Sequence, residues 1–403
     1  MTLPLDGLRV IDFTQVWAGP QISACLGDMG AEVVRVESNA GTDVQRNTNR
    51  EKSEMRKLLE THWYYRSREY YVTLNLLKEE GVALLKRMLH WGDVLVLNLS
   101  PHKQRALGVD YETLRKEKPD LILVAFSAAG QWGPYDDLLA FGPSMNIAVG
   151  SDALVGYPED HGKPMLHVWD PDPGMGVMLG YAILTAVFHR SRTGEGQLVD
   201  LPFSELLPNF LGEPILEYQI SGEVPKPKGN RHPHMAPHEI YPSSGEDTWV
   251  SIAVATEEEW RSFCTVIGEP DLAADPRFAT LSARQANLAV LDETVSTWTR
   301  SCSNIQATHL LQQAGVAAAP AYKVSELYHD PHDISRRTSI NVNVDNLNAN
   351  DVTYGIPWRL SETPGAIRGL GRPLGADNKR FFGGELQLDP TEIKRLIEGQ
   401  VIY

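Results

Sequence analysis

The chain has 403 residues, 42% of them hydrophobic and 22% charged, which is typical of a globular protein long enough for two domains. A net charge of −15 argues against a nucleic-acid partner, because binding a phosphate backbone needs a basic surface. The uncharged segment 174–188 is too short to cross a membrane, no signal peptide is recognisable, and three scattered cysteines predict no disulfide framework, so we expect a cytoplasmic protein without membrane contact.

The first third of the chain predicts alternating strands and helices. We expect strands at 8–13, 31–37, 71–76, 93–98 and 121–126, and helices at about 18–29, 79–91 and 111–117. This alternation predicts a doubly wound, Rossmann-like α/β domain with a parallel sheet. Asn98 and Ser127 follow two of the strands and should lie at the carboxyl edge of the sheet, where such domains bind ligands.

The turn after the first strand has a single glycine, Gly19, and not the three-glycine signature of dinucleotide-binding proteins. NAD is therefore a poor candidate ligand. The turn still offers backbone N–H groups at a helix start, which suit phosphates or the close approach of an adenine-type ring.

The segment 39–69 is polar and irregular. Five arginines lie among its acidic residues, and we expect most of them to be solvated and one or two to meet phosphates; they are Arg46, Arg50, Arg56, Arg66 and Arg68.

Asp170 lies in a short Pro- and Gly-rich turn before an apolar helix that we expect to begin near Gly174. A carboxylate at such a helix start can serve as an acid, a base or a nucleophile. Asp170 or Asp172 could equally cap the helix, and these residues alone favour the cap.

The second half of the chain predicts a change of architecture. A strand at 197–201 and a helix at 204–218 precede a Pro- and Lys-rich linker at 224–229. Further strands at 239–241 and 249–255 and helices at 257–268, 284–299 and 304–314 follow. We therefore predict a small α+β domain at 225–325 and a large domain formed by 1–224 and 326–403.

Other catalytic or metal sites have little support in the sequence. His232, His234 and His238 lie close together, but two prolines interrupt them and no acidic or cysteine partner is correctly spaced, so we expect no metal. Ser127 lacks the nucleophile-elbow sequence, and no pair of carboxylates suits glycoside chemistry.

Several segments, in order along nearly the whole chain, resemble the class III CoA-transferases, the CaiB/BaiF family. They are 4–20, 30–37, 93–98, 130–134, 193–197, 229–233, 236–237, 275–278, 314–316, 355–357 and 360–364. The resemblance implies that Asp170 is the nucleophile and that Gly174 leads its helix. It also implies CoA transfer from an acyl-CoA donor to a carboxylic acid acceptor through an aspartyl intermediate, with no metal. Backbone N–H groups near Asp170 would stabilise the oxyanion.

The resemblance further implies which residues contact CoA. They are Gln15, Val16, Trp17 and Ala18 in the first turn, Leu74 and Asn75 at the end of the third strand, and Asn98 with the loop that follows it, including Arg105. Trp17 could cover the nucleotide or the pantetheine arm by apolar contact. Ser38 stands where many members carry an arginine, and Arg105 falls one position early, so Arg35, Arg46 or Arg105 could meet the phosphates.

Family members form intertwined homodimers, and we expect the same here.

The alternative enzyme is an α-methylacyl-CoA racemase of the same fold, which needs two bases around the α-carbon. Gly142 stands at the position of the racemase histidine, which argues against racemisation. The racemase glutamate would fall near Thr256, and Glu257 is adjacent to that position. His167 could also approach Asp170, which keeps the racemase as an alternative. A catalytically silent CoA-binding protein is a third reading. Trp132 and Trp169 are either substrate-lining or core residues.

Overall fold

The computed structural model describes residues 2–39, 41, 43–47, 65–158, 171–344 and 349–403. These residues fold into two compact units. One comprises Met1–Asp152, His167–Glu223 and Arg337–Tyr403, and the other comprises Ala153–Leu166 and Val224–Arg336. The sequence predicted a small domain at 225–325 and a large domain formed by the rest of the chain.

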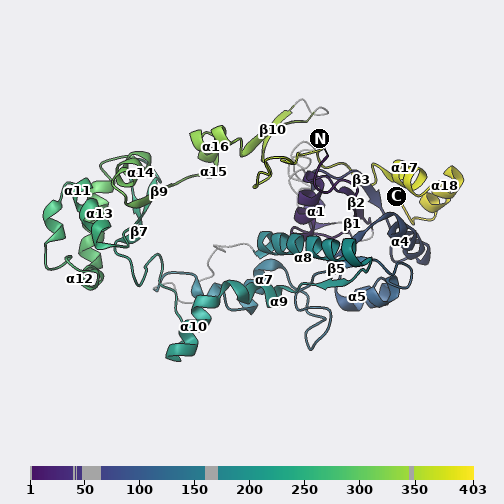
Figure 1. The fold of residues 1–403 in the computed structure, drawn as a ribbon, viewed down its shortest axis with the longest axis horizontal. Helices are drawn as coiled ribbons and strands as arrows, with labels where there is room; N and C mark the ends of the chain where they lie inside the picture. The colour runs from purple at the N-terminus through teal and green to yellow at the C-terminus, as the bar shows by residue number, and fades with distance from the viewer. Residues whose placement is uncertain (1, 40, 42, 48–64, 159–170, 345–348) are drawn as a thin grey trace. The chain divides into compact units, whose positions relative to one another are not determined.

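Among the described residues of the first unit, six strands form one parallel sheet (Figure 1). They are β1 (Arg9–Phe13), β2 (Glu32–Glu37), β3 (Tyr70–Thr73), β4 (Val94–Leu97), β5 (Ile122–Ala125) and β6 (Leu198–Asp200). Their order in the sheet is β3-β2-β1-β4-β5-β6, and every neighbouring pair is parallel. The strand order therefore reverses between β1 and β4, which is the position where open α/β sheets bind ligands. The predicted doubly wound α/β fold is confirmed.

The helices of this unit follow the strands along the chain. They are α1 (Ala18–Asp28), α2 (Val44–Asn47), α4 (Glu79–Trp91), α5 (Pro101–Leu107), α6 (Tyr111–Leu114), α7 (Gly142–Ala148), α8 (Pro171–Thr193), α9 (Phe203–Leu206), α10 (Gly212–Ser221), α17 (Asn378–Arg380) and α18 (Pro390–Glu398). Short 3₁₀ segments lie at Asp152–Leu154 and Leu207–Phe210, and a π-helical turn lies at Phe381–Glu385. A hairpin of β10 (Ser339–Val344) and β11 (Ala349–Tyr354) also belongs to this unit.

Side chains of the strands alternate between two apolar cores. In β1, Val10 packs in the core with α1 and α8, whereas Ile11 packs in the core with α4 and α18. Because both faces of the sheet are covered, its strands read as nearly continuous apolar runs. A charged residue inside such a strand needs a partner within the protein.

The long helix α8 packs closely against α1. It begins at Pro171, three residues before the predicted start at Gly174. Gly180 permits the close approach, because a Cβ atom at this position would lie 2.6 Å from the side chain of Ile22 in α1. No helix in the described part of the chain has the length and hydrophobicity needed to span a bilayer.

The C-terminal segment covers the edge strand β3. The backbone N–H groups of Tyr71 and Thr73 donate to the side chains of Asp377 and Asn378, at 3.0 and 2.9 Å. These bonds satisfy donors that an edge strand would otherwise expose.

The second unit is a small α+β fold. Its described strands β7 (His238–Pro242), β8 (Trp249–Ala253) and β9 (Ala317–Ala321) form an antiparallel sheet in that order. Its helices are α11 (Glu257–Val266), α12 (Leu281–Ala286), α13 (Leu288–Thr299), α14 (Asn304–Gln313), α15 (Val324–Leu327) and α16 (Pro331–Arg336), with a 3₁₀ turn at Pro270–Ala273. Trp260, Phe263 and Phe278 fill its core.

Some predicted elements were wrong. The single helix expected at 204–218 is divided into α9, a 3₁₀ turn and α10, because Pro208 and Gly212 interrupt it. The helices α5 and α7 and the strand β9 were not predicted, since each is short and carries a weak periodic signal.

Candidate functional site

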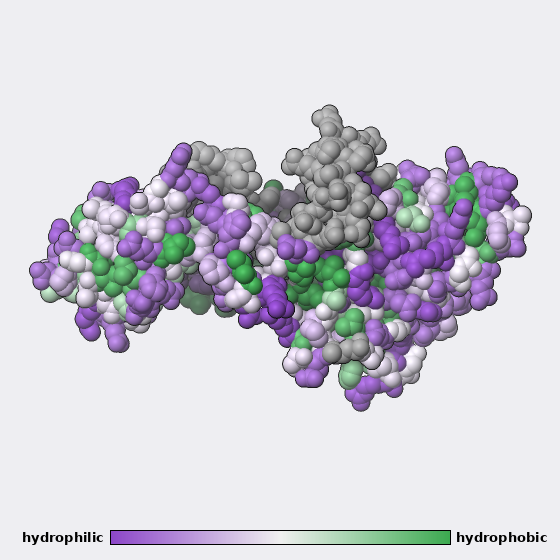
Figure 2. All heavy atoms as spheres, turned by 90° about the horizontal axis from the view of Figure 1, so that it is seen from above, coloured by the Kyte–Doolittle hydropathy of each residue, from purple (hydrophilic) through white to green (hydrophobic). Residues whose placement is uncertain are grey.

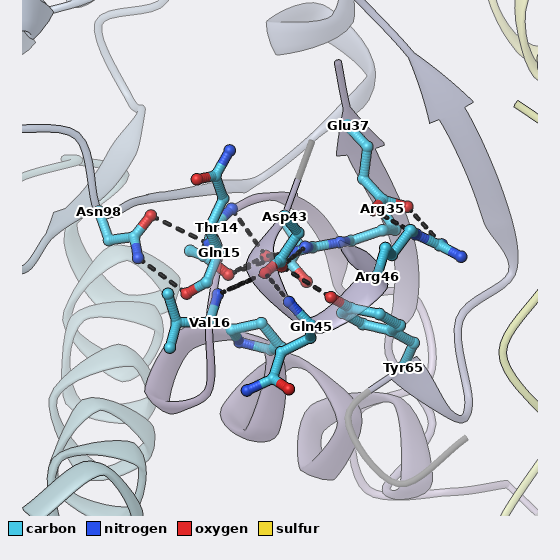
Figure 3. A network of polar contacts seen from close by, with 12 residues as sticks. Thr14, Gln15, Val16, Arg35, Glu37, Asp43, Gln45, Arg46, Tyr65 and Asn98 are labelled. Atoms are coloured by element: carbon cyan, nitrogen blue, oxygen red, sulfur yellow. Dashed lines mark hydrogen bonds and ion pairs between the residues drawn. The ribbon is translucent and has the colours of Figure 1, made fainter. Parts of the chain in front are cut away.

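The turn between β1 and α1 lies at the switch point of the sheet and is joined there to the loop after β4. The backbone N–H of Gln15 donates to Asn98 Oδ1 at 3.0 Å, and Asn98 Nδ2 donates to the carbonyl oxygen of Gln15 at 2.9 Å (Figure 3). Two predicted CoA contacts, 83 positions apart, are thus brought together. Their reciprocal hydrogen bonds fix the turn relative to β4.

Val16, the next residue of the turn, has a left-handed backbone conformation with φ of 71°. This conformation is rare for a β-branched residue and stores strain. Its N–H donates to both carboxylate oxygens of Asp43, at 3.1 and 3.2 Å (Figure 3). Asp43 follows β2, so the turn is held by both neighbours of β1 in the sheet.

Asp43 belongs to a buried polar cluster beneath the turn. Its side chain is 2% exposed and accepts further hydrogen bonds from Arg35 at 3.0 Å and from the Tyr65 hydroxyl at 2.7 Å. Burial and the Asp43 carboxylate raise the pKa of Tyr65 despite the nearby guanidinium of Arg35, so its hydroxyl remains a donor.

Asp12 and its two arginines form the base of this cluster. Arg35 and Arg68 each approach the Asp12 carboxylate at 3.1 Å, and all three side chains are buried. Burial would raise the pKa of Asp12, but the two guanidinium groups outweigh it and hold this pKa below its ordinary value. Asp12 also accepts hydrogen bonds from the backbone and hydroxyl of Thr14, which ties the ion pairs to the start of the turn.

The first turn of α1 approaches the end of β1 closely. A Cβ atom at Gly19 would lie 2.4 Å from Thr14, so the single glycine of this turn is required for packing. Gln15 is exposed, Val16 and Trp17 are half-buried, and Ala18 is buried. Of the predicted contacts in this turn, the side chains of Gln15, Val16 and Trp17 therefore remain reachable, whereas that of Ala18 does not.

A small cavity adjoins this turn at the carboxyl ends of β1 and β2. Its lining residues include Thr14, Gln15, Ser38, Gly41 and Asp43. The cavity places polar groups beside the exposed edge of the turn.

Leu74 and Asn75, also predicted as CoA contacts, are more deeply buried than the residues of the Gln15–Trp17 turn. Leu74 is fully buried, and Asn75 is 7% exposed. The N–H of Asn75 donates to the carbonyl of Val401 at 2.9 Å, and its side-chain amide donates to the carbonyl of Gln400. The C-terminal segment therefore covers this strand end, and the geometry gives these two residues no support as ligand contacts.

The arginines predicted to meet phosphates differ in availability. Arg35 is fully buried, and Arg46 binds Glu37 through two hydrogen bonds of 2.6 and 2.5 Å. Arg105 has a 53% exposed side chain and pairs with Asp136 at 3.2 Å. Of these three, Arg105 is the side chain best placed to meet a phosphate from solvent.

The expectation that most arginines of 39–69 are solvated was wrong for Arg66 and Arg68, which are buried. Arg66 binds Asp28 and Arg68 binds Asp12, because a buried guanidinium needs a carboxylate partner. Arg50 and Arg56 lie outside the described residues.

The predicted nucleophile Asp170 lies outside the described residues, as do His167 and Trp169. The residue that follows it in sequence, Pro171, is buried and begins α8. Gly142, at the start of α7, lies against this first turn: a Cβ atom there would be 2.3 Å from Asp172 Oδ2 and 2.8 Å from Pro171. A side chain at 142 would therefore require Asp172 and Pro171 to move. Trp132 is 72% exposed, which excludes it from the core.

The residues nearest the expected racemase glutamate have structural roles in the second unit. Thr256 caps α11 by accepting a hydrogen bond from the N–H of Glu259. Glu257 binds the buried Arg284 through two hydrogen bonds of 2.9 and 3.0 Å, and these lower its pKa. A carboxylate held in this way is a weak base.

His232 and His238 lie close together, with ring centroids 5.2 Å apart. His238 Nδ1 contacts the carbonyl of Asn230, and His232 Nδ1 accepts a hydrogen bond from the N–H of His234. Across the described residues, no group of three or more His, Cys, Asp or Glu side chains is arranged to hold a metal ion.

Sequence reasoning missed Asp12, Asp43 and Tyr65 as parts of the site. A signal existed for Asp12, and also for Arg35, because each is a charged residue inside an otherwise apolar parallel strand and so requires a buried partner. No comparable signal identified Asp43 or Tyr65, because Asp43 lies 27 positions from Val16 and 22 positions from Tyr65.

Comparison with known proteins places this geometry in a family. A family model described as CoA-transferase family III matches residues 5–378. Succinyl-CoA–D-citramalate CoA-transferase of Chloroflexus aurantiacus is 32% identical over 99% of this chain and 98% of its own length. Succinate–glutarate CoA-transferase of Agrobacterium fabrum is 30% identical over 90% of each chain. The crystal structure of a CaiB/BaiF family protein from Brucella suis superimposes with a TM-score of 0.85 and 28% identity, covering 96% of this chain and all of that one.

Proposed function

Because this chain belongs to CoA-transferase family III, we propose that it moves CoA from an acyl-CoA thioester to a free carboxylic acid through a covalent intermediate on Asp170. CoA transfer is the activity of the family, and the family match over residues 5–378 is the observation that carries the proposal.

The proposed reaction proceeds through two kinds of covalent intermediate. The Asp170 carboxylate attacks the thioester carbonyl, the C–S bond breaks, and CoA thiolate leaves an aspartyl–acyl anhydride. The thiolate then attacks the aspartyl carbonyl of the anhydride. This attack forms an aspartyl–CoA thioester and releases the donor acid. The acceptor carboxylate attacks this thioester, and the released thiolate finally takes the acceptor acyl group and restores Asp170. Protons and electrons balance without a metal or a redox partner.

Two features of the described residues support these roles. Asp170 immediately precedes Pro171, the first residue of a 23-residue helix, and the positive end of a helix dipole favours a carboxylate and a developing oxyanion. The turn at Gln15–Trp17 lies at the switch point with its edge exposed, which supports its assignment to CoA.

The racemase alternative has less support. Gly142, at the position of the racemase histidine, has no side chain that could act as a base. Glu257, the alternative second base, is bound to Arg284 and has a lowered pKa. Both observations favour transfer over racemisation.

The names of the relatives suggest which acids to test first. Succinyl-CoA and D-citramalate appear in the name of one relative, and succinate and glutarate appear in the name of another. We propose succinyl-CoA as the donor and small dicarboxylic acids as acceptors for this chain.

We also propose that the chain forms the intertwined homodimer expected from the resemblance. Hydrophilic residues predominate on the face shown in Figure 2, and hydrophobic residues gather there in a few patches. Helix α8 exposes Val177, Tyr181 and Phe188, each by more than 60%, and α10 exposes Ile220 by 85%. Apolar helix faces of this kind suit burial against a second copy.

Sedimentation equilibrium of the wild-type protein should give twice the mass of one chain. The substitution Tyr181→Glu should shift the population towards monomer. A monomeric wild-type protein would refute the proposed dimer.

The decisive experiment is to trap the covalent intermediate. The protein is incubated with succinyl-CoA, treated with hydroxylamine or borohydride, and analysed by peptide mass spectrometry. We expect modification at Asp170, which is lost in Asp170→Ala together with at least 10³-fold of the transfer rate.

Asp137→Ala is the matched control, because Asp137 is an exposed carboxylate of the same unit. It should keep both the adduct and the rate. An absent adduct, together with deuterium exchange at the α-carbon of a 2-methylacyl-CoA, would favour the racemase. CoA binding with neither signal would indicate a silent binding protein.

A further inference from the structure

We propose that Asp43 is a positioning residue for CoA binding. Its buried carboxylate holds Val16 in the left-handed conformation and so fixes the backbone of the Gln15–Trp17 turn. The inference rests on the proposed function, which assigns this turn to CoA. It adds a residue that does not itself contact the substrate.

Val16 has a strained backbone conformation. A valine with φ of 71° adopts a conformation that the isolated turn would leave, because its branched side chain crowds the backbone there. Its N–H points at Asp43 and donates to both oxygens of the carboxylate. Removing the Asp43 carboxylate would allow the turn to relax. The backbone groups of Gln15, Val16 and Trp17 would then move.

Asp43 is itself prevented from moving. One carboxylate oxygen accepts from Arg35 and Tyr65, and the other accepts from the N–H of Gln45 at 3.1 Å (Figure 3). A carboxylate with this many donors has a single orientation, and charge-assisted hydrogen bonds are the stronger kind. The strain in Val16 is therefore opposed by a rigid acceptor.

The turn is also held on its other side. Asn98 binds the N–H and the carbonyl of Gln15, whereas Asp43 binds the N–H of Val16. The two tethers come from the loops after β4 and after β2, and between them they immobilise consecutive peptide groups. Because Asp43 is 2% exposed and its oxygens are occupied by protein donors, its effect on a ligand must pass through the turn.

A double-mutant cycle tests this role. We expect Asp43→Ala to raise the KM for the acyl-CoA donor, and the Kd for CoA, at least tenfold, with a much smaller change in kcat. Glycine adopts positive φ without strain, so in a Val16→Gly background the same Asp43→Ala change should raise KM less than threefold. Asp43→Asn keeps one oxygen for the Val16 N–H and should raise KM less than Asp43→Ala does.

Asp28→Ala is the matched control. Asp28 is a buried carboxylate of α1 that binds Arg66 and Ser67, away from the turn. It should lower the melting temperature while leaving the donor KM within twofold, in both the wild-type and the Val16→Gly background. Melting curves of every variant separate lost stability from lost binding.

The outcomes distinguish this inference from the proposed function. Equal effects of Asp43→Ala in the two backgrounds, or a KM rise in Asp28→Ala as large as in Asp43→Ala, would show that Asp43 serves folding alone. Wild-type protein that binds CoA with an affinity unchanged by Asp43→Ala and Asp43→Asn would refute the inference and leave the function standing. Wild-type protein that binds no CoA in calorimetry would overturn both.

Discussion

Two strand ends at the same edge of the sheet, after β1 and after β3, were both expected to contact CoA, yet the structure treats them in opposite ways. The turn after β1 leaves Gln15 exposed and is held from beneath by buried charged side chains. The end of β3 is covered by the C-terminal segment, which binds Asn75 through neutral hydrogen bonds. The difference teaches that a place at the carboxyl edge does not suffice for a ligand site, because another segment of the chain can occupy it.

The largest expected effect comes from breaking the charged base of the first region. Asp12→Ala leaves Arg35 and Arg68 without a shared carboxylate in a buried environment, and should lower the free energy of unfolding by about 3–5 kcal/mol. Urea denaturation measures this loss. Asn378→Ala, which removes neutral hydrogen bonds at the β3 end, should cost only about 1–3 kcal/mol. Equal losses in the two variants would remove the distinction between the regions.

The dependence of stability on acid pH should also distinguish the charged base of the first region from the neutral hydrogen bonds at the β3 end. The pKa of Asp12 in the folded protein is lower than its ordinary value of 3.8. The ionised carboxylate therefore stabilises the fold fully at pH values above the pKa that Asp12 has in the unfolded chain. This stabilisation is lost as the pH falls through the pKa that Asp12 has in the folded protein. We therefore expect the unfolding free energy of wild type to fall more steeply below about pH 4 than that of Asp12→Asn. Asn75 and Asn378 do not titrate, so Asn378→Ala should keep the wild-type slope. Parallel curves for wild type and Asp12→Asn would contradict the ionic account.

A matched pair of asparagines tests the comparison directly at the level of binding. Asn98→Ala removes both hydrogen bonds to Gln15 and should raise the donor KM and the Kd for CoA by about 10- to 100-fold. Asn75→Ala should change them less than about threefold while lowering stability by about 1–2 kcal/mol. Calorimetry with CoA and thermal melts of both variants provide the measurements. A reversed pattern would return Asn75 to the CoA site.

The smallest effect is expected at Arg105. Its side chain is exposed and its ion pair with Asp136 is near the surface, so Arg105→Ala should leave stability within about 0.5 kcal/mol of wild type. If the guanidinium binds a CoA phosphate, the donor KM should rise about three- to tenfold at low salt, with a smaller rise at 0.5 M NaCl. Arg115, an exposed arginine paired with Glu112, provides the control through Arg115→Ala. Identical KM values for wild type and Arg105→Ala at low salt would exclude Arg105 from phosphate binding.

Much of the site was visible in the sequence because its elements are local. Alternating apolar strands and helices predicted the sheet. Asn98 and Ser127 at strand ends predicted its ligand edge, and the family resemblance added Gln15. Asp12 and Arg35 also had a readable signal, as charges inside buried strands. The burial of Arg66 and Arg68 was not predicted, because a polar stretch of sequence does not reveal that Asp28 and Asp12 lie within reach.

By itself the sequence determined the α/β class, the order of its main elements and the membership of a CoA-transferase family, because these follow from periodicity and from motifs a few residues long. Only the tertiary structure decided which strand end stays open. Asp43 reaches Val16 across 27 positions, and Val401 reaches Asn75 across a much longer separation. Contacts of that kind arise when the chain folds back on itself, and no local pattern encodes whether the returning segment will support a turn or cover it.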